Sequence, residues 1–238
     1  MAKVESLQIN LPGSGSRTFR RRDTRADLGV VAQMFEHQHY SFGRLRRGAE
    51  LVRQYEELVA AGRRPLVLDF GAHIGAAAVY FALQFPRAHI VALEPDAANF
   101  ALLEANVAGL DVDARCVAVG SRDGEAALVD PGEGEWGYRT AAGKGIRVES
   151  AARLVADKLA AGYAPYLAKI DIEGGEGELF SADTGWADSF PLVIIELHDW
   201  LMPGAGTSRG FLAWAAARER DFVPIGENVF SIANRAPA

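Results

Sequence analysis

The segment 66–96 constrains the fold of this chain more than any other part. An unbroken apolar run, Leu66–Leu68, ends at Asp69, and after a glycine turn and a helix-compatible stretch a second apolar run, Ile90–Leu93, ends at Glu94. Apolar runs of strand length on either side of a helix are typical of a βαβ unit whose parallel strands are buried on both faces. The segment therefore predicts an α/β fold.

The residues at the two strand ends indicate a nucleoside-cofactor site. Gly71 and Gly75 lie in the turn after the first strand, and glycine lets a backbone approach a ligand closely because it has no Cβ and tolerates positive φ. Glu94 follows the turn by about 20 residues, the separation at which an acidic residue accepts hydrogen bonds from ribose hydroxyls in nucleotide-binding βαβ units.

The glycine spacing helps to identify the cofactor. A dinucleotide fingerprint reads G-x-G-x-x-G, whereas this turn reads Gly71-Ala-His-Ile-Gly75, with no middle glycine. Asp69 beside the turn would repel a pyrophosphate. It suits a cofactor with a cationic end, such as the ammonium group of a methionine moiety.

Two later segments add polar side chains at the ends of further strands. They are YLAKIDIEGGE, which ends at Glu176, and PLVIIELH, which ends at His198. In open α/β sheets ligands bind beyond the carboxyl ends of the strands. The polar residues expected there are Asp69, Glu94, Asp171, Glu173, Glu196, His198 and Asp199. Each has a simpler explanation as a helix cap or a satisfied core residue, but so many titratable groups exceed what packing requires.

Taken together, the motifs DFGAHIG, LEPD, KIDIEGGEGELF and VIIELH resemble the FkbM-type family of class I S-adenosylmethionine (SAM)-dependent methyltransferases, over roughly 27–230. The resemblance implies a Rossmann-like, mostly parallel seven-stranded sheet with helices on both faces and a C-terminal antiparallel hairpin. It implies SAM as the cofactor, in a site lined by Asp69, Gly71, His73, Gly75, Glu94 and Asp171. Two departures adjoin this site: His73 replaces the usual Asn, and Gly-Gly-Glu follows KIDIE.

The resemblance further implies O-methylation of a hydroxyl on a small-molecule or sugar-containing metabolite. A hydroxyl has a high pKa and benefits from a base within hydrogen-bond reach. We expect His198 to be that base, because an imidazole titrates near working pH, with Glu196 or Asp199 orienting it and Asp171 beside it. A divalent metal held by Asp171, Glu196 and His198 is an alternative that we do not favour, since the sequence has no dense ligand motif.

Two other functions stay open at this point. One is an NAD-type oxidoreductase, which the missing G-x-G-x-x-G pattern argues against. The other is a non-catalytic SAM-binding module, which would bind the cofactor without turnover. The pair His37-x-His39 is a weak metal signal, and we expect it at the surface or in a lid.

The amino-acid composition of the chain limits the classes of binding partner. The net charge of −6 over 238 residues argues against nucleic acid, which favours a basic face. Apolar runs of strand length predict no membrane span, and the N-terminus has no apolar secretory core. The single cysteine, Cys116, lies in an apolar run and is expected to be an inert core residue, so the predicted location is cytoplasmic. The expected partner is a small-molecule methyl acceptor; the oligomeric state stays open, a homodimer included.

The chain divides into two parts. Residues 1–47 are predicted to be an N-terminal arm and helical extension, with a poorly ordered arm over Met1–Ser16 and a solvated basic cluster over Arg17–Arg25. Residues 48–238 are predicted to form the methyltransferase domain. An insertion near 120–147, rich in glycine, is expected to be a small antiparallel unit or a mobile loop over the site.

Overall fold

The computed structural model describes residues 2–11, 15–129 and 139–234. Its strands are β1 Val4–Leu11, β2 Gly15–Arg22, β3 Arg64–Phe70, β4 His89–Leu93, β5 Val112–Arg115, β6 Ala118–Gly120, β7 Gly124–Val129, β8 Arg139–Ala142, β9 Ile146–Ser150, β10 Tyr163–Ile170, β11 Leu192–Glu196, β12 Arg220–Ile225 and β13 Asn228–Ala233. Its helices are α1 Arg25–Val31, η1 Ala32–Glu36, η2 Phe42–Arg44, α2 Gly48–Ala60, α3 Ala76–Gln84, α4 Ala97–Val107, α5 Ala151–Ala160, α6 Glu176–Leu179, α7 Gly185–Asp188 and α8 Arg209–Ala216.

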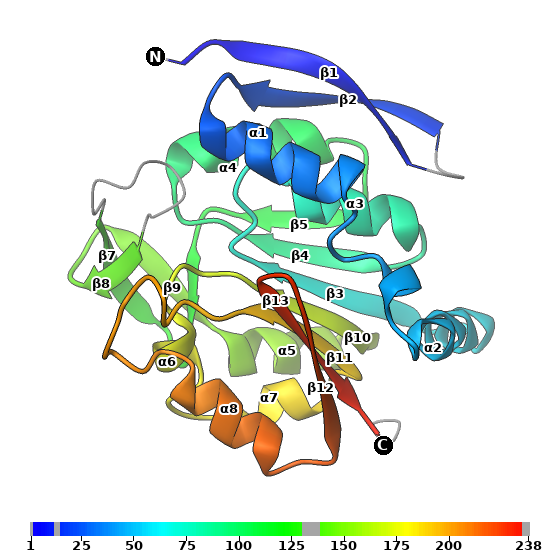
Figure 1. Ribbon diagram of the computed structural model, residues 1–238, viewed down its shortest axis with the longest axis vertical. Helices are drawn as coiled ribbons and strands as arrows, with labels where there is room; N and C mark the ends of the chain where they lie inside the picture. Colours follow the sequence, from blue (N-terminus) through cyan, green and yellow to red (C-terminus); the bar gives the residue numbers. More distant parts are fainter. Residues whose placement is uncertain (1, 12–14, 130–138, 235–238) are drawn as a thin grey trace.

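A seven-stranded sheet forms the centre of the molecule, in the order β12-β13-β11-β10-β3-β4-β5 (Figure 1). The strands from β11 to β5 pair in parallel, and the β12–β13 hairpin adds antiparallel pairing at one edge. This is the Rossmann-like, mostly parallel seven-stranded sheet with a C-terminal antiparallel hairpin that the sequence predicts.

Two hydrophobic cores sandwich the sheet. Side chains alternate along a strand, so Val67 of β3 packs against α2, α3 and α4, whereas Leu66 and Leu68 pack on the opposite face against α5, α7 and α8. Both sets of side chains are fully buried. The continuous apolar runs in the sequence are therefore explained by burial of the central strands on both faces.

Most of the segment Met1–Ser16 lies in strands β1 and β2, so the expectation of a poorly ordered arm is wrong for these residues; residues 1 and 12–14 lie outside the described residues. Strands β1 and β2 form an antiparallel hairpin that lies beside α4, and Ile9, Leu11 and Phe19 are buried in the core. The spacing of two residues between Ile9 and Leu11 along β1 is the strand signal that the sequence interpretation missed. The basic cluster is not simply solvated either, because Arg17 donates to the carbonyl oxygen of Asn106 in α4.

The insertion contains a second, four-stranded sheet of order β6-β9-β7-β8. Strand β7 pairs antiparallel with β8 and β9, as expected, but β6 pairs in parallel with β9. Residues 130–138 of the predicted insertion lie outside the described residues. The one cysteine, Cys116, lies between β5 and β6 and is exposed, so it is not the core residue that its apolar neighbours predicted. Among the described residues, no helix has the length and apolar character to cross a bilayer.

Candidate functional site

The carboxyl ends of β3, β4, β10 and β11 meet at one edge of the sheet, and the predicted site residues follow those ends. They fall into two groups. The nucleoside-side group consists of His73, Glu94 and Asn99, together with Arg22 and Asp27 from the N-terminal segment. The carboxylate–histidine cluster consists of Asp171, Glu173, Glu176, Glu196 and His198.

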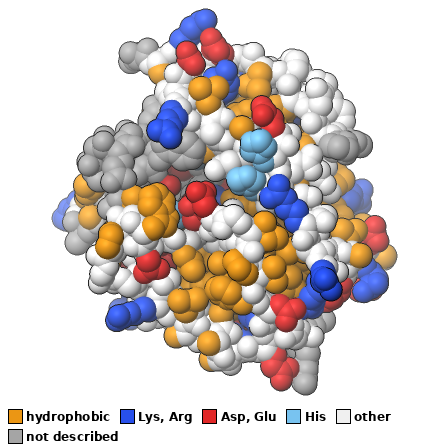
Figure 2. All heavy atoms as spheres, in the orientation of Figure 1, with side chains coloured by type: hydrophobic (Ala, Val, Ile, Leu, Met, Phe, Trp, Pro, Cys, Tyr) orange, Lys and Arg blue, Asp and Glu red, His pale blue; other side chains and the backbone are white. Residues whose placement is uncertain are grey.

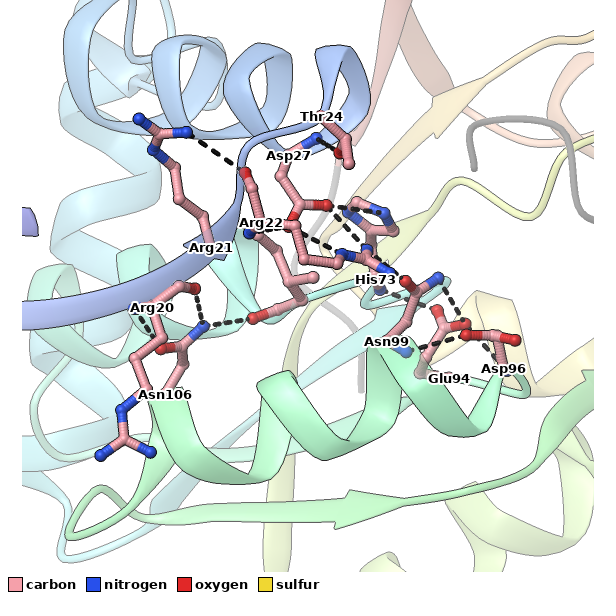
Figure 3. A network of polar contacts seen from close by, with 11 residues as sticks. Arg20, Arg21, Arg22, Thr24, Asp27, His73, Glu94, Asp96, Asn99 and Asn106 are labelled. Carbon is pink, nitrogen blue, oxygen red and sulfur yellow. Dashed lines mark hydrogen bonds and ion pairs between the residues drawn. The ribbon is translucent and has the colours of Figure 1, made fainter. Parts of the chain in front are cut away.

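Both carboxylate oxygens of Glu94 accept hydrogen bonds from the protein (Figure 3). Oε2 accepts from the backbone N–H of His73 at 2.8 Å, and Oε1 accepts from the backbone N–H of Asp96 at 2.9 Å and from the Asn99 amide at 3.4 Å. Burial raises the pKa of Glu94 to about 7, although these hydrogen bonds act in the opposite direction. Glu94 is thus held firmly at the end of β4.

Arg22 and Asp27 of the N-terminal segment join the nucleoside-side group by hydrogen bonds that the sequence analysis did not predict (Figure 3). Arg22 donates from Nη2 to Asp27 Oδ1 at 2.7 Å and to Asn99 Oδ1 at 2.6 Å, and from Nε to Asp27 Oδ2 at 3.0 Å. Asp27 is fully buried, and its backbone N–H is capped by the Thr24 hydroxyl. The Thr24-x-x-Asp27 pattern is a helix-start signal that marks α1, but no sequence pattern pairs Arg22 with Asn99.

His73 lies in the glycine turn with φ of +49°, in the left-handed region. Asn and His enter this region more easily than most residues, which explains how His replaces the usual Asn here. Both of its ring nitrogens are buried without a hydrogen-bond partner in the described structure, and Nε2 lies 3.7 Å from Asp27 Oδ1. Burial lowers the pKa of His73 to about 4, so the ring is neutral near pH 7.

The two turn glycines are required by contacts within the protein. Gly71 has φ of +77°, and a Cβ there would lie 1.7 Å from the carbonyl oxygen of Asp171. Gly75 has φ of +86°, and a Cβ there would lie 2.7 Å from Leu103 Cδ1 of α4. These glycines therefore let the turn pack against the end of β10 and against α4, a reason that the sequence interpretation did not include.

Asp69 faces inward and pairs with a buried lysine. Its Oδ1 lies 3.0 Å from Lys169 Nζ, its neighbour across β3 and β10, and the Asp69 side chain is 0% exposed. Burial raises the pKa of Asp69, and the charge of Lys169 opposes that rise. Lys169 also donates to the carbonyl oxygen of Gly71 at 2.6 Å. Lys169, which the sequence analysis did not single out, thus links Asp69 and the glycine turn through one ion pair and one hydrogen bond.

In the carboxylate–histidine cluster, one imidazole is surrounded by acidic side chains. His198 Nδ1 is hydrogen-bonded to Glu176 Oε1 at 2.8 Å. Its Nε2 lies 3.4 Å from Glu173 Oε2, 3.5 Å from Glu196 Oε1 and 3.8 Å from Asp171 Oδ1. The group that orients His198 is therefore Glu176 rather than Glu196 or Asp199. No local pattern identifies Glu176, because it comes from α6, which only the folded chain brings to His198, two residues beyond the end of β11.

Burial and charge act against each other in this cluster. Burial lowers the pKa of His198, but the hydrogen bond to Glu176 and the negative charges of Asp171 and Glu173 outweigh it and raise the pKa to about 9. Burial and the charge of Asp171 raise the pKa of Glu196 to about 8 and that of Glu173 to about 7. His198 thus holds a proton near neutral pH in the ligand-free chain.

An exposed aromatic side chain adjoins the cluster. Trp200 is 66% exposed, and its ring centroid lies 6.3 Å from that of His198. Leu212 of α8 and Phe222 of β12 are also exposed hydrophobic residues. Figure 2 shows hydrophobic side chains gathered in the lower half of this face, around α8 and the β12–β13 hairpin. A contiguous exposed apolar surface of this kind indicates a place where a ligand or another molecule binds.

Comparisons with known proteins identify the chain's relatives. The family model described as "Methyltransferase FkbM domain" matches residues 69–222. The fold is similar to that of an O-methyltransferase from Bacillus cereus in complex with SAH, with 11% identity, 87% of this chain and 91% of that chain covered, and a TM-score of 0.46. It is also similar to monomeric WbdD, with 16% identity, 78% and 40% covered, and a TM-score of 0.45. No curated protein sequence matches the chain.

Proposed function

The chain belongs to the FkbM methyltransferase family, and from this we propose that it transfers the methyl group of SAM to a hydroxyl of a small-molecule or sugar-containing metabolite. The observation that supports this proposal best is the position of Asp171 between the two groups. Its backbone carbonyl packs against the Gly71 turn, and its side chain lies 3.8 Å from His198. A cofactor at the turn and an acceptor at the cluster would therefore meet beside Asp171.

The residues proposed to hold SAM are Asp69, Gly71, His73, Gly75, Glu94 and Asp171. The polar groups of this set fit a nucleoside cofactor, since the two ring nitrogens of His73 have no partner within the described protein. A carboxylate offers about four lone-pair positions, and the protein uses three at Glu94, which leaves capacity for a ribose hydroxyl. Bound SAM would supply an electrophilic methyl group, and these residues would fix its position and exclude water.

The residues proposed to contact the acceptor are Asp171, Glu196 and His198. The two carboxylates bind and orient the hydroxyl, since each side chain is partly exposed at the sheet edge. The high pKa of His198 means that its Nε2 already holds a proton near neutral pH. His198 can act as the base only when that proton has been displaced.

Calorimetric titration with SAM tests the cofactor site. We expect the wild-type chain to bind SAM and Glu94→Ala to bind it about 1–3 kcal/mol more weakly, because a charged acceptor for ribose hydroxyls is lost. Glu104→Ala is the matched control, since Glu104 is an exposed residue on the neighbouring helix α4. Failure of the wild-type chain to bind SAM, or equal affinities for wild type and Glu94→Ala, would contradict the proposal.

A turnover assay tests the proposed methyl transfer separately from SAM binding. Incubation with SAM and a panel of hydroxylated metabolites should give a product heavier by one methylene unit, detected by mass spectrometry. Tight SAM binding without methylated product across that panel would favour a non-catalytic SAM-binding module instead.

A further inference from the structure

We propose that Asp171, Glu196 and His198 bind one divalent cation of the Mn²⁺ class at the acceptor end of the site. One ligand atom from each residue lies within 4.8 Å of the others. The sequence analysis did not favour a metal because the sequence has no dense ligand motif. A catalytic role for the ion rests on the proposed function, whereas its binding does not.

The spacing of the ligand atoms fits a shared ion better than it fits hydrogen bonds. Charge-assisted N–H···O bonds have lengths of about 2.7–2.9 Å. His198 Nε2 is farther than that from its acidic neighbours, at 3.5 Å from Glu196 Oε1 and 3.8 Å from Asp171 Oδ1. Ligand atoms on a metal with bonds of about 2.0–2.2 Å stand roughly 3–3.6 Å apart. The separation of Nε2 from Glu196 Oε1, 3.5 Å, lies within that range, and its separation from Asp171 Oδ1, 3.8 Å, lies slightly above it, so a small inward shift of Asp171 would complete the site.

The environment of His198 is a second, independent observation. The side chain is 1% exposed, and Nε2 makes no hydrogen bond among the described residues, although Nδ1 bonds to the buried Glu176. A metal-binding histidine almost always donates its other ring N–H to a carboxylate, which fixes the tautomer and turns the free nitrogen towards the metal. Glu176 and His198 have this arrangement, and Nε2 points towards the carboxylates of Asp171 and Glu196.

The charge balance also favours a cation. Around Nε2 lie the carboxylates of Asp171, Glu173 and Glu196, all only partly exposed. The nearest lysine, Lys169, is 3.6 Å from Asp171 but lies closer to Asp69, at 3.0 Å. Partly buried carboxylates that outnumber their cationic partners are costly to ionise, and a divalent ion would offset that cost.

One imidazole with two carboxylates indicates the class of ion. Imidazole suits later transition metals, whereas carboxylates suit Mg²⁺, Ca²⁺ and Mn²⁺, so Mn²⁺ is compatible with both ligand types. The partial exposure of Asp171 leaves an open side for an acceptor oxygen. An ion in this position would lower the pKa of a bound hydroxyl, so the acceptor could lose its proton without His198 as the base.

The test is a Mn²⁺ titration of the full chain without SAM, followed by electron paramagnetic resonance of the free ion. We expect one bound Mn²⁺ per chain and at least about a tenfold loss of affinity in Asp171→Asn and in Glu196→Gln, which keep the side-chain shapes. The control is the double variant His37→Gln/His39→Gln, because these two rings, with centroids 6.0 Å apart, are not among the proposed ligands and could bind metal themselves. Its affinity should equal that of the wild type.

Three results would overturn the site: no bound Mn²⁺ in the wild-type chain, unchanged affinity in Asp171→Asn and Glu196→Gln, or loss of binding in the His37/His39 control. Circular dichroism of each variant verifies that it is folded. A SAM titration of the same samples separates the two proposals. Normal SAM binding without Mn²⁺ binding refutes the metal site alone, and Mn²⁺ binding without SAM binding refutes the cofactor proposal alone.

Discussion

The nucleoside-side group and the carboxylate–histidine cluster lie along the same sheet edge, yet they satisfy their carboxylates differently. Three protein N–H groups donate hydrogen bonds to the single carboxylate of Glu94. One of these donors, Asn99, in turn accepts a hydrogen bond from Arg22. In the cluster, four carboxylates share a single imidazole. Glu94 is satisfied by protein donors and keeps capacity for one further hydrogen bond, whereas the cluster has more acceptors than donors and is incomplete without a ligand.

Removal of the imidazole should have the largest effect, because it removes the side chain that all four carboxylates of the cluster face. We expect His198→Ala to lower the free energy of unfolding by about 3–5 kcal/mol, since the buried Glu176 would lose its charged partner and keep only the hydrogen bond from the backbone N–H of Gly174. Urea denaturation near neutral pH measures the change. Glu176→Gln, which keeps an acceptor for Nδ1–H, should cost less. A loss below about 1 kcal/mol in His198→Ala would show that the cluster does not depend on this pair.

The pH dependence of the free energy of unfolding should reveal the raised pKa of Glu94. Glu94 releases its proton near pH 7 when folded but near 4.5 when unfolded, so between these values the folded chain binds more protons. The contribution of Glu94 to stability is therefore complete at low pH and is lost as the pH rises through this range, by at most about 3 kcal/mol. Denaturation of wild type and Glu94→Gln across the range measures it. Parallel stability curves would mean that Glu94 titrates normally.

The smallest effect on stability is expected at the open side of the cluster. Trp200 is largely exposed, so Trp200→Ala should change the free energy of unfolding by less than about 0.5 kcal/mol. If acceptors bind beside the cluster, the same variant should raise the KM for the acceptor and leave SAM affinity unchanged. A large loss of stability, or an unchanged KM, would place the acceptor elsewhere.

The sequence predicted the central strands because their apolar runs and terminal acids are local patterns. It also placed Glu94, Asp171, Glu196 and His198 at one edge, since parallel strands expose their carboxyl ends together. It missed the N-terminal hairpin, although the alternating residues Ile9 and Leu11 indicate a strand, because the neighbouring Gly and Ser residues favoured an irregular segment.

Only the tertiary structure decided which polar groups meet. Arg22 and Asn99 are 77 residues apart in the chain, and Glu176 reaches His198 from a different element. The pKa values of Glu94 and His198 depend on such neighbours and on burial, neither of which local sequence encodes. The sequence by itself therefore determined the central strands and the residues at their ends, because backbone patterning is local. The fold determined their partners and protonation, because electrostatic interactions depend on distances in space.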